Sequence, residues 1–113
     1  MNDYFTILFS SRELNSAEFQ VCLNESCRVY EGHFPGKPIA PGACSIEMIR
    51  RLASQVLNKE IRFTTIKQCK FSALLVPDEN QILNVEMKWE NNVLQAVVMR
   101  NAVSAIRFKA IIL

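Results

Sequence analysis

The segment 32–42, which reads GHFPGKPIAPG, restricts the fold of this chain more than any other feature. Pro35, Pro38 and Pro41 each lack a backbone N–H, and each disfavours helical geometry in the residue before it, so no helix forms between residues 32 and 41. From Gly42 onward the pattern changes to apolar residues at three- and four-residue spacing, namely Ile46, Ile49, Leu52, Ala53, Val56 and Leu57. This spacing predicts an amphipathic helix over 42–57 that is largely buried.

Most of the remaining chain has the alternating pattern of strands. Leu83, Val85, Met87 and Trp89 alternate with polar residues, which predicts a strand with one buried face. Asn91-Asn92 suits a two-residue hairpin turn, because asparagine tolerates a positive φ. The strands expected from such patterns cover 19–23, 66–76, 83–90, 93–99 and 103–113. Residues 29–30 predict a short extended piece, and residues 1–15 are ambiguous.

One long helix followed by several antiparallel strands predicts an α+β layer, with the sheet against the helix. A chain of 113 residues fits a single domain, 1–113. A single sheet leaves its edge strands open, and such a domain often dimerises.

Charge and cysteine content exclude several classes of protein. The net charge is only +2, which argues against a nucleic-acid binder. Ten of the 13 lysines and arginines follow residue 47, and this basic second half could attract an acidic protein partner. The four cysteines form no Cys-x-x-Cys pair and there is one histidine, so we expect no metal site and reduced thiols in a cytoplasmic protein. No apolar run is long enough to span a membrane, and no secretory signal is visible.

His33 and Glu47 are the candidate acid–base groups. Histidine is the side chain whose ordinary pKa lies nearest neutrality, and Glu47 falls in the second turn of the predicted helix. The free N–H groups of Gly42 and Ala43 at the helix start could hold a carbonyl oxygen. Together these groups suit removal of a proton next to a carbonyl and expulsion of a leaving group.

Simpler structural roles remain open for the same residues. His33 could cap a turn in the proline-rich loop. Glu47 could form a surface ion pair with Arg50 or Arg51, which follow it by three and four residues on the helix. Cys44 could be an activated thiol, although a small packed side chain is favoured because no second histidine is present to act as its base.

The pattern His33-Phe34-Pro35-Gly36-x-Pro38-x-x-Pro41-Gly42, with Glu47 fourteen residues after the histidine, resembles the signature of FabZ-type 3-hydroxyacyl-acyl carrier protein dehydratases. Lys70-Phe71 and Val76-Pro77-Asp78 are similar to the family's later strand and turn. The resemblance implies a hot-dog fold, an antiparallel sheet wrapped around one long central helix.

The resemblance also implies roles for individual residues. His33 corresponds to the catalytic base and Glu47 to the acid that protonates the departing 3-hydroxyl group. The product is a trans-2-enoyl thioester in fatty acid or related acyl or polyene biosynthesis. No cofactor is implied. The expected substrate-binding residues are Gly42, whose amide holds the thioester carbonyl, together with Ala43, Phe34, Ile46 and Arg51.

Arg51 replaces the family's glutamine, and a cation there favours the ionised form of Glu47. In the family the active site straddles a homodimer, so His33 of one chain would face Glu47 of the other, and a trimer of dimers is compatible. The expected partner is an acidic acyl carrier protein. Its candidate contacts are Arg50, Arg51, Lys59, Arg62, Lys67 and Lys70.

Two other functions remain open at this stage. The chain could be a non-catalytic hot-dog subunit that binds an acyl chain or a carrier protein. It could also be a hot-dog acyl thioesterase, which would release a free thiol.

Overall fold

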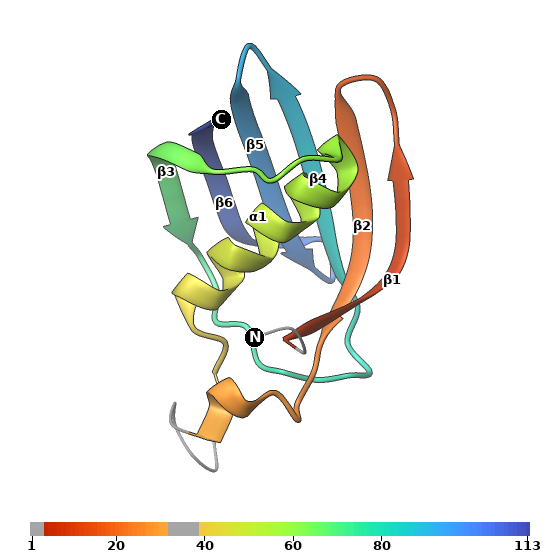
Figure 1. The fold of residues 1–113 in the computed structure, drawn as a ribbon. Coiled ribbons are helices and arrows are strands. Elements are labelled where there is room, and N and C mark those ends of the chain that lie inside the picture. The colour runs from red at the N-terminus through yellow and green to blue at the C-terminus, as the bar shows by residue number, and fades with distance from the viewer. Residues whose placement is uncertain (1–3, 32–38) are drawn as a thin grey trace.

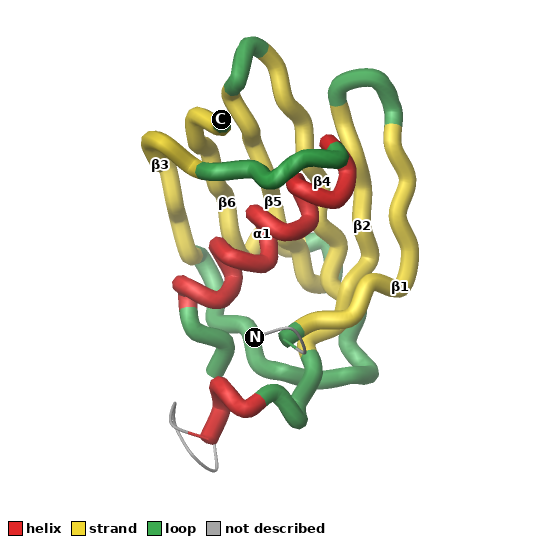
Figure 2. The backbone as a smooth tube through the Cα atoms, in the orientation of Figure 1, coloured by secondary structure: helices red, strands yellow, loops and turns green. Residues whose placement is uncertain are grey.

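The computed structural model describes residues 4–31 and 39–113 (Figures 1 and 2). These residues form six strands, one short 3-10 helix and one α-helix. In chain order the elements are β1 (Phe5–Arg12), β2 (Ser16–Leu23), η1 (Arg28–Glu31), α1 (Gly42–Leu57), β3 (Phe63–Phe71), β4 (Leu83–Glu90), β5 (Val93–Arg100) and β6 (Val103–Ile112). The strands form one antiparallel sheet in the order β1-β2-β4-β5-β6-β3, which confirms the α+β prediction.

Helix α1 lies across one face of this sheet (Figure 1). It begins after Pro41, whose carbonyl oxygen accepts hydrogen bonds from the amides of Cys44 and Ser45, both at 3.1 Å. It ends at Asn58, which takes a left-handed conformation with φ of 54°. These bounds confirm the predicted helix over 42–57. Its buried face consists of Cys44, Ser45, Met48, Ile49, Leu52 and Ala53.

Two tight hairpins connect β4, β5 and β6. Asn91 and Asn92 have φ values of 51° and 63°, as a type I′ turn requires, and this confirms the predicted turn. Asn101 and Ala102 repeat the same pair of values. Both turns match the twist of the strands that they join, so β4, β5 and β6 are adjacent antiparallel strands.

Three segments differ from the sequence-based prediction. Strand β1 was not foreseen, because a register shift between Ile7 and Phe9 interrupts its alternation. Residues 28–31 form a 3-10 helix where an extended piece was expected at 29–30. Strand β3 covers 63–71 where 66–76 was expected, so the expectation of a strand over 72–76 was wrong.

The segment after β3 is held by other contacts. The carbonyl oxygen of Leu75 accepts a hydrogen bond from the amide of Ala40 at 2.7 Å. Leu75 itself is buried in the core. This hydrogen bond joins the residues that precede α1 to the segment that follows β3. It therefore helps to hold the start of the helix in place.

The edge strands of the sheet are β1 and β3. On β3, the side chains of Ile66 and Phe71 are about half exposed, at 48% and 49%. Within 4–31 and 39–113, no helix is long and apolar enough to cross a membrane.

Candidate active site

Glu47 lies in the second turn of α1, where its carboxylate is bound by two arginines of the same helix. Arg50 makes a two-point contact, with Nε 2.7 Å from Oε1 and Nη2 2.8 Å from Oε2. The Nε of Arg51 donates to the same Oε2 at 3.2 Å. The three side chains are between 25% and 31% exposed, so the cluster is half-buried. The ion pair left open by the sequence therefore forms, with Arg50 as the main partner.

These contacts keep Glu47 ionised to a lower pH than an isolated glutamate. The hydrogen bonds from Arg50 lower the pKa of the carboxyl group most, burial opposes them, and Arg51 lowers the pKa further. The pKa of Glu47 therefore lies below its ordinary value, and at neutral pH the group is a carboxylate. The sequence had assigned this effect to Arg51, whereas the structure gives the larger share to Arg50.

The guanidinium group of Arg50 is itself anchored beyond the end of the helix. Its Nη1 donates to Oε1 of Glu60 at 2.7 Å and to the carbonyl oxygen of Ile61 at 3.1 Å. Ser54 adds a second link, because its hydroxyl accepts from the amide of Ile61 at 3.0 Å. Ile61 is fully buried, so Nη1 of Arg50 binds a well-packed residue outside the helix.

The residues of the predicted carbonyl site, Gly42 and Ala43, are the first two of α1. The amides of Gly42 and Ala43 precede the first hydrogen bonds within the helix, as at any helix start. A Cβ atom at Gly42 would lie 3.0 Å from Cζ of Phe71 on β3. A larger residue here would require the ring of Phe71 to shift by a few tenths of an ångström. The small size of Gly42 therefore has a packing consequence in addition to its predicted role at the carbonyl site.

Ile46 is partly buried and packs against the core, and Ala43 is exposed. Among the predicted site residues, the described structure places Gly42, Ala43, Ile46, Glu47 and Arg51 on the first three turns of one helix. His33 and Phe34 lie outside the described residues.

Sequence reasoning missed Tyr4 as a support for this helix. Its hydroxyl is 3.3 Å from the hydroxyl of Ser45, and both side chains are buried. Tyr30 lies close by, with its ring centroid 6.3 Å from that of Tyr4. No sequence pattern points to this contact, because Tyr4 precedes β1 in a segment without clear alternation.

Cys44 behaves as a packed side chain. It belongs to the buried core, and burial raises the pKa of its thiol. A raised pKa leaves less of the nucleophilic thiolate at neutral pH. The structure therefore supports the packing role. No group of three or more His, Cys, Asp or Glu side chains that could hold a metal occurs within 4–31 and 39–113.

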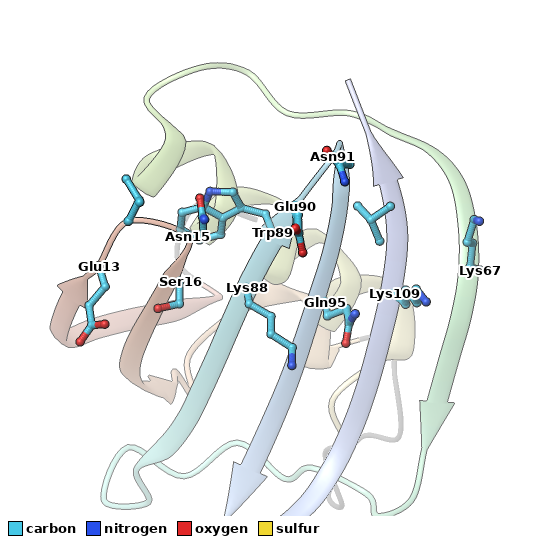
Figure 3. A pocket seen from close by; sticks show the side chains of 12 residues that line it. Glu13, Asn15, Ser16, Lys67, Lys88, Trp89, Glu90, Asn91, Gln95 and Lys109 are labelled. Carbon is cyan, nitrogen blue, oxygen red and sulfur yellow. The ribbon is translucent and has the colours of Figure 1, made fainter.

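A depression of about 620 Å³ lies on the face of the sheet turned away from α1 (Figure 3). Lys88, Gln95 and Lys109 lie side by side on its floor, on three neighbouring strands in register. Neither Glu47 nor Gly42 lines it. This depression is therefore separate from the candidate active site.

Comparison with known proteins identifies the family of the chain. The family model of the ApeI-like proteins, described as ApeI dehydratase, matches residues 10–109. The chain belongs to the ApeI-like dehydratase family. The hot-dog dehydratase resemblance stated from the sequence is thereby confirmed.

Curated relatives carry the name 3-hydroxyacyl-[acyl-carrier-protein] dehydratase FabZ. The protein of Levilactobacillus brevis is 36% identical over 97 residues, which cover 74% of this chain and 64% of that protein. The protein of Lactiplantibacillus plantarum is 35% identical over 97 residues, covering 74% and 65%. This ApeI-like chain thus spans just under two thirds of the length of these relatives.

Solved structures show the same fold. The chain matches a structure titled the dehydratase heterocomplex ApeI:P from Xenorhabdus doucetiae with a TM-score of 0.84 and 22% identity, over 95% of this chain and 96% of that one. An uncharacterised protein from Erwinia carotovora matches with a TM-score of 0.74 and 18% identity, over 96% and 95%. The six-stranded sheet with one helix therefore fits the hot-dog fold.

Proposed function

We propose that this ApeI-like chain dehydrates (3R)-3-hydroxyacyl thioesters carried on an acyl carrier protein to trans-2-enoyl thioesters. The observation that carries the proposal is the placement of Glu47. It is a half-buried carboxylate one turn beyond the free amides of Gly42 and Ala43, on a helix that begins nine residues after His33 in the sequence. Family membership over residues 10–109 supports the same reaction.

In the proposed reaction, the amide of Gly42 holds the thioester carbonyl and stabilises the negative charge that develops on its oxygen. His33 removes the α-proton. The α-proton passes to the departing 3-hydroxyl group through the His33–Glu47 pair, the C3–O bond breaks, water leaves, and the double bond forms between the two carbons. Acid–base groups of this kind contribute about 10²–10⁴-fold to a rate. Phe34, Ile46 and Arg51 remain proposed contacts of the substrate.

The proposed assembly is a homodimer in the cytoplasm, in which His33 of one chain meets Glu47 of the other. The open edge at β3, with Ile66 and Phe71 half exposed, supports a partner chain in that region. The carrier protein is the second proposed partner. Arg50 and Arg51 are engaged with Glu47, so the exposed cations left for an acidic carrier are Lys59, Arg62, Lys67 and Lys70.

The test is turnover of carrier-linked 3-hydroxyacyl substrates of several chain lengths. Turnover is measured as formation of the enoyl product. We expect His33→Ala to lower kcat by at least about 100-fold, because it removes the base. Arg107→Gln, an exposed cation on β6, serves as the control and should keep wild-type turnover. Equal activity of His33→Ala and wild type would rule out the assigned base.

One observation favours a second function. Both oxygens of Glu47 are bound by arginines, which suits a non-catalytic subunit that binds an acyl or carrier partner. Tight binding of the acyl carrier with no turnover at any chain length would select this function over dehydration.

A further inference from the structure

Arg50 differs from Arg51 in the number and geometry of its contacts with Glu47. It grips both oxygens of Glu47 at 2.7 and 2.8 Å, and its remaining nitrogen binds Glu60 and the carbonyl oxygen of Ile61. A planar guanidinium that binds a carboxylate at two points fixes its orientation as well as its charge. Arg51, by contrast, reaches Glu47 through a single contact at 3.2 Å.

Arg50 also links Glu47 to the connection between α1 and β3, where Ile61 is fully buried. The carbonyl oxygen of Ile61 accepts from Arg50, and the amide of Ile61 donates to Ser54. The Glu47 side chain is therefore held through Arg50 against the α1–β3 connection as well as against its own helix. Among the described residues, the charged groups in contact with the carboxylate are Arg50 and Arg51, and Glu60 shares Arg50 from the connection.

We propose that Arg50 is a positioning residue of the dehydratase site, which holds Glu47 in one orientation as a carboxylate so that Glu47 orients the 3-hydroxyl group instead of protonating it. This inference rests on the proposed function. Its chemical consequence is that the α-proton taken by His33 is the proton that leaves. The α C–H and the C3–O bonds break, the carbon–carbon double bond forms, and His33 returns its proton to the departing oxygen to make water.

The two roles of Glu47 predict opposite effects of Arg50→Gln. Loss of the two-point contact brings the pKa of Glu47 back toward its ordinary value. If Glu47 works as a carboxylate in a fixed orientation, kcat at neutral pH falls by about tenfold with KM changed by less than about threefold, because misplacement of a reacting group is costly. If Glu47 works as an acid, the same change makes more of the protonated form available, and kcat rises.

The experiment follows Glu47 itself as well as turnover. Carboxyl-carbon NMR across a pH series should show Glu47 titrating at lower pH in the wild type than in Arg50→Gln. Arg50→Lys keeps the charge without the two-point contact and should recover only part of kcat. Glu60→Gln frees one nitrogen of Arg50 and should move the Glu47 titration by less than Arg50→Gln does.

The outcomes are separable. A rise of kcat in Arg50→Gln at neutral pH, or a Glu47 titration that is the same in both proteins, overturns the positioning role. Full recovery of kcat by Arg50→Lys also overturns it, since charge alone would then suffice. If the wild type dehydrates no substrate, the proposed function fails. The NMR titration of Glu47 then still tests whether Arg50 lowers the pKa of its carboxyl group. Arg107→Gln should match the wild type in both measurements.

Discussion

Two ion pairs in this chain have the same residue types and the same spacing but differ in nearly everything else. Arg28 and Glu31, in η1, are 4.0 Å apart, and their side chains are 88% and 73% exposed. Glu47 and Arg50, in α1, are 2.7 Å apart and are 31% and 25% exposed. The first pair is a solvated surface contact. The second is part of a fixed cluster at the candidate active site.

The difference shows that three-residue spacing says little about the strength of a pair. In α1 the glutamate precedes the arginine, which is the order favoured by the helix dipole, and in η1 the order is reversed. Arg50 is also anchored by Glu60 and Ile61, whereas an exposed pair loses side-chain entropy for a weak attraction. Partial burial and a second anchor therefore distinguish the pair with a proposed function.

Neutralising the glutamate of each pair should give the largest contrast. Glu47→Gln keeps the size of the side chain but removes the charge, so we expect dehydration to fall by at least about 100-fold. Glu31→Gln should change turnover by less than about twofold, because that carboxylate is exposed. The measurement is kcat with a carrier-linked 3-hydroxyacyl substrate. Similar losses in the two variants would remove the distinction between the pairs.

The second contrast is in stability and its dependence on pH. The pKa of Glu47 is lower in the folded protein than in the unfolded chain, where it is ~4.3. The Glu47–Arg50 pair therefore stabilises the fold fully above that unfolded pKa. This stabilisation is lost as the pH falls through the lower folded pKa. Arg50→Gln should lower the free energy of unfolding by about 1 kcal/mol at pH 7. Urea denaturation at a series of pH values should show the gap from wild type closing toward acid. A gap that widens toward acid would contradict the lowered pKa.

The smallest effect should come from exchanging the two residues of the exposed pair. The double variant Arg28→Glu, Glu31→Arg places the glutamate first, and we expect the free energy of unfolding to change by less than about 0.5 kcal/mol. Denaturation midpoints at low and high salt would measure this. A loss comparable with that of Arg50→Gln would mean that exposure does not separate the two pairs.

Local sequence rules predicted much of the fold. The helix over 42–57 follows from a proline that precedes it, a clear apolar stripe and an asparagine at its end. The turn at Asn91-Asn92 follows from the positive φ that asparagine tolerates. Strand β1 and the end of β3 depend on register shifts and on tertiary contacts such as that between Leu75 and Ala40, which leave no periodic signal.

The candidate site was predictable only in part. The sequence pointed to Glu47 and to the arginines that follow it, because helical spacing places them on one face. It assigned the effect on the charge of Glu47 to Arg51 instead of Arg50, since the choice between them depends on where Glu60 and Ile61 lie after the helix ends. The pairing of His33 with Glu47 stays a prediction, because His33 lies outside the described residues.

The contact between Gly42 and Phe71 links the evolution of two distant positions. A Cβ at position 42 would lie 3.0 Å from the end of the ring at position 71, so a side chain there requires the ring to shift by a few tenths of an ångström. A change at either position therefore alters which residues are acceptable at the other. In ApeI-like chains that share this contact, the first residue of the helix and the last residue of the edge strand should vary as a pair.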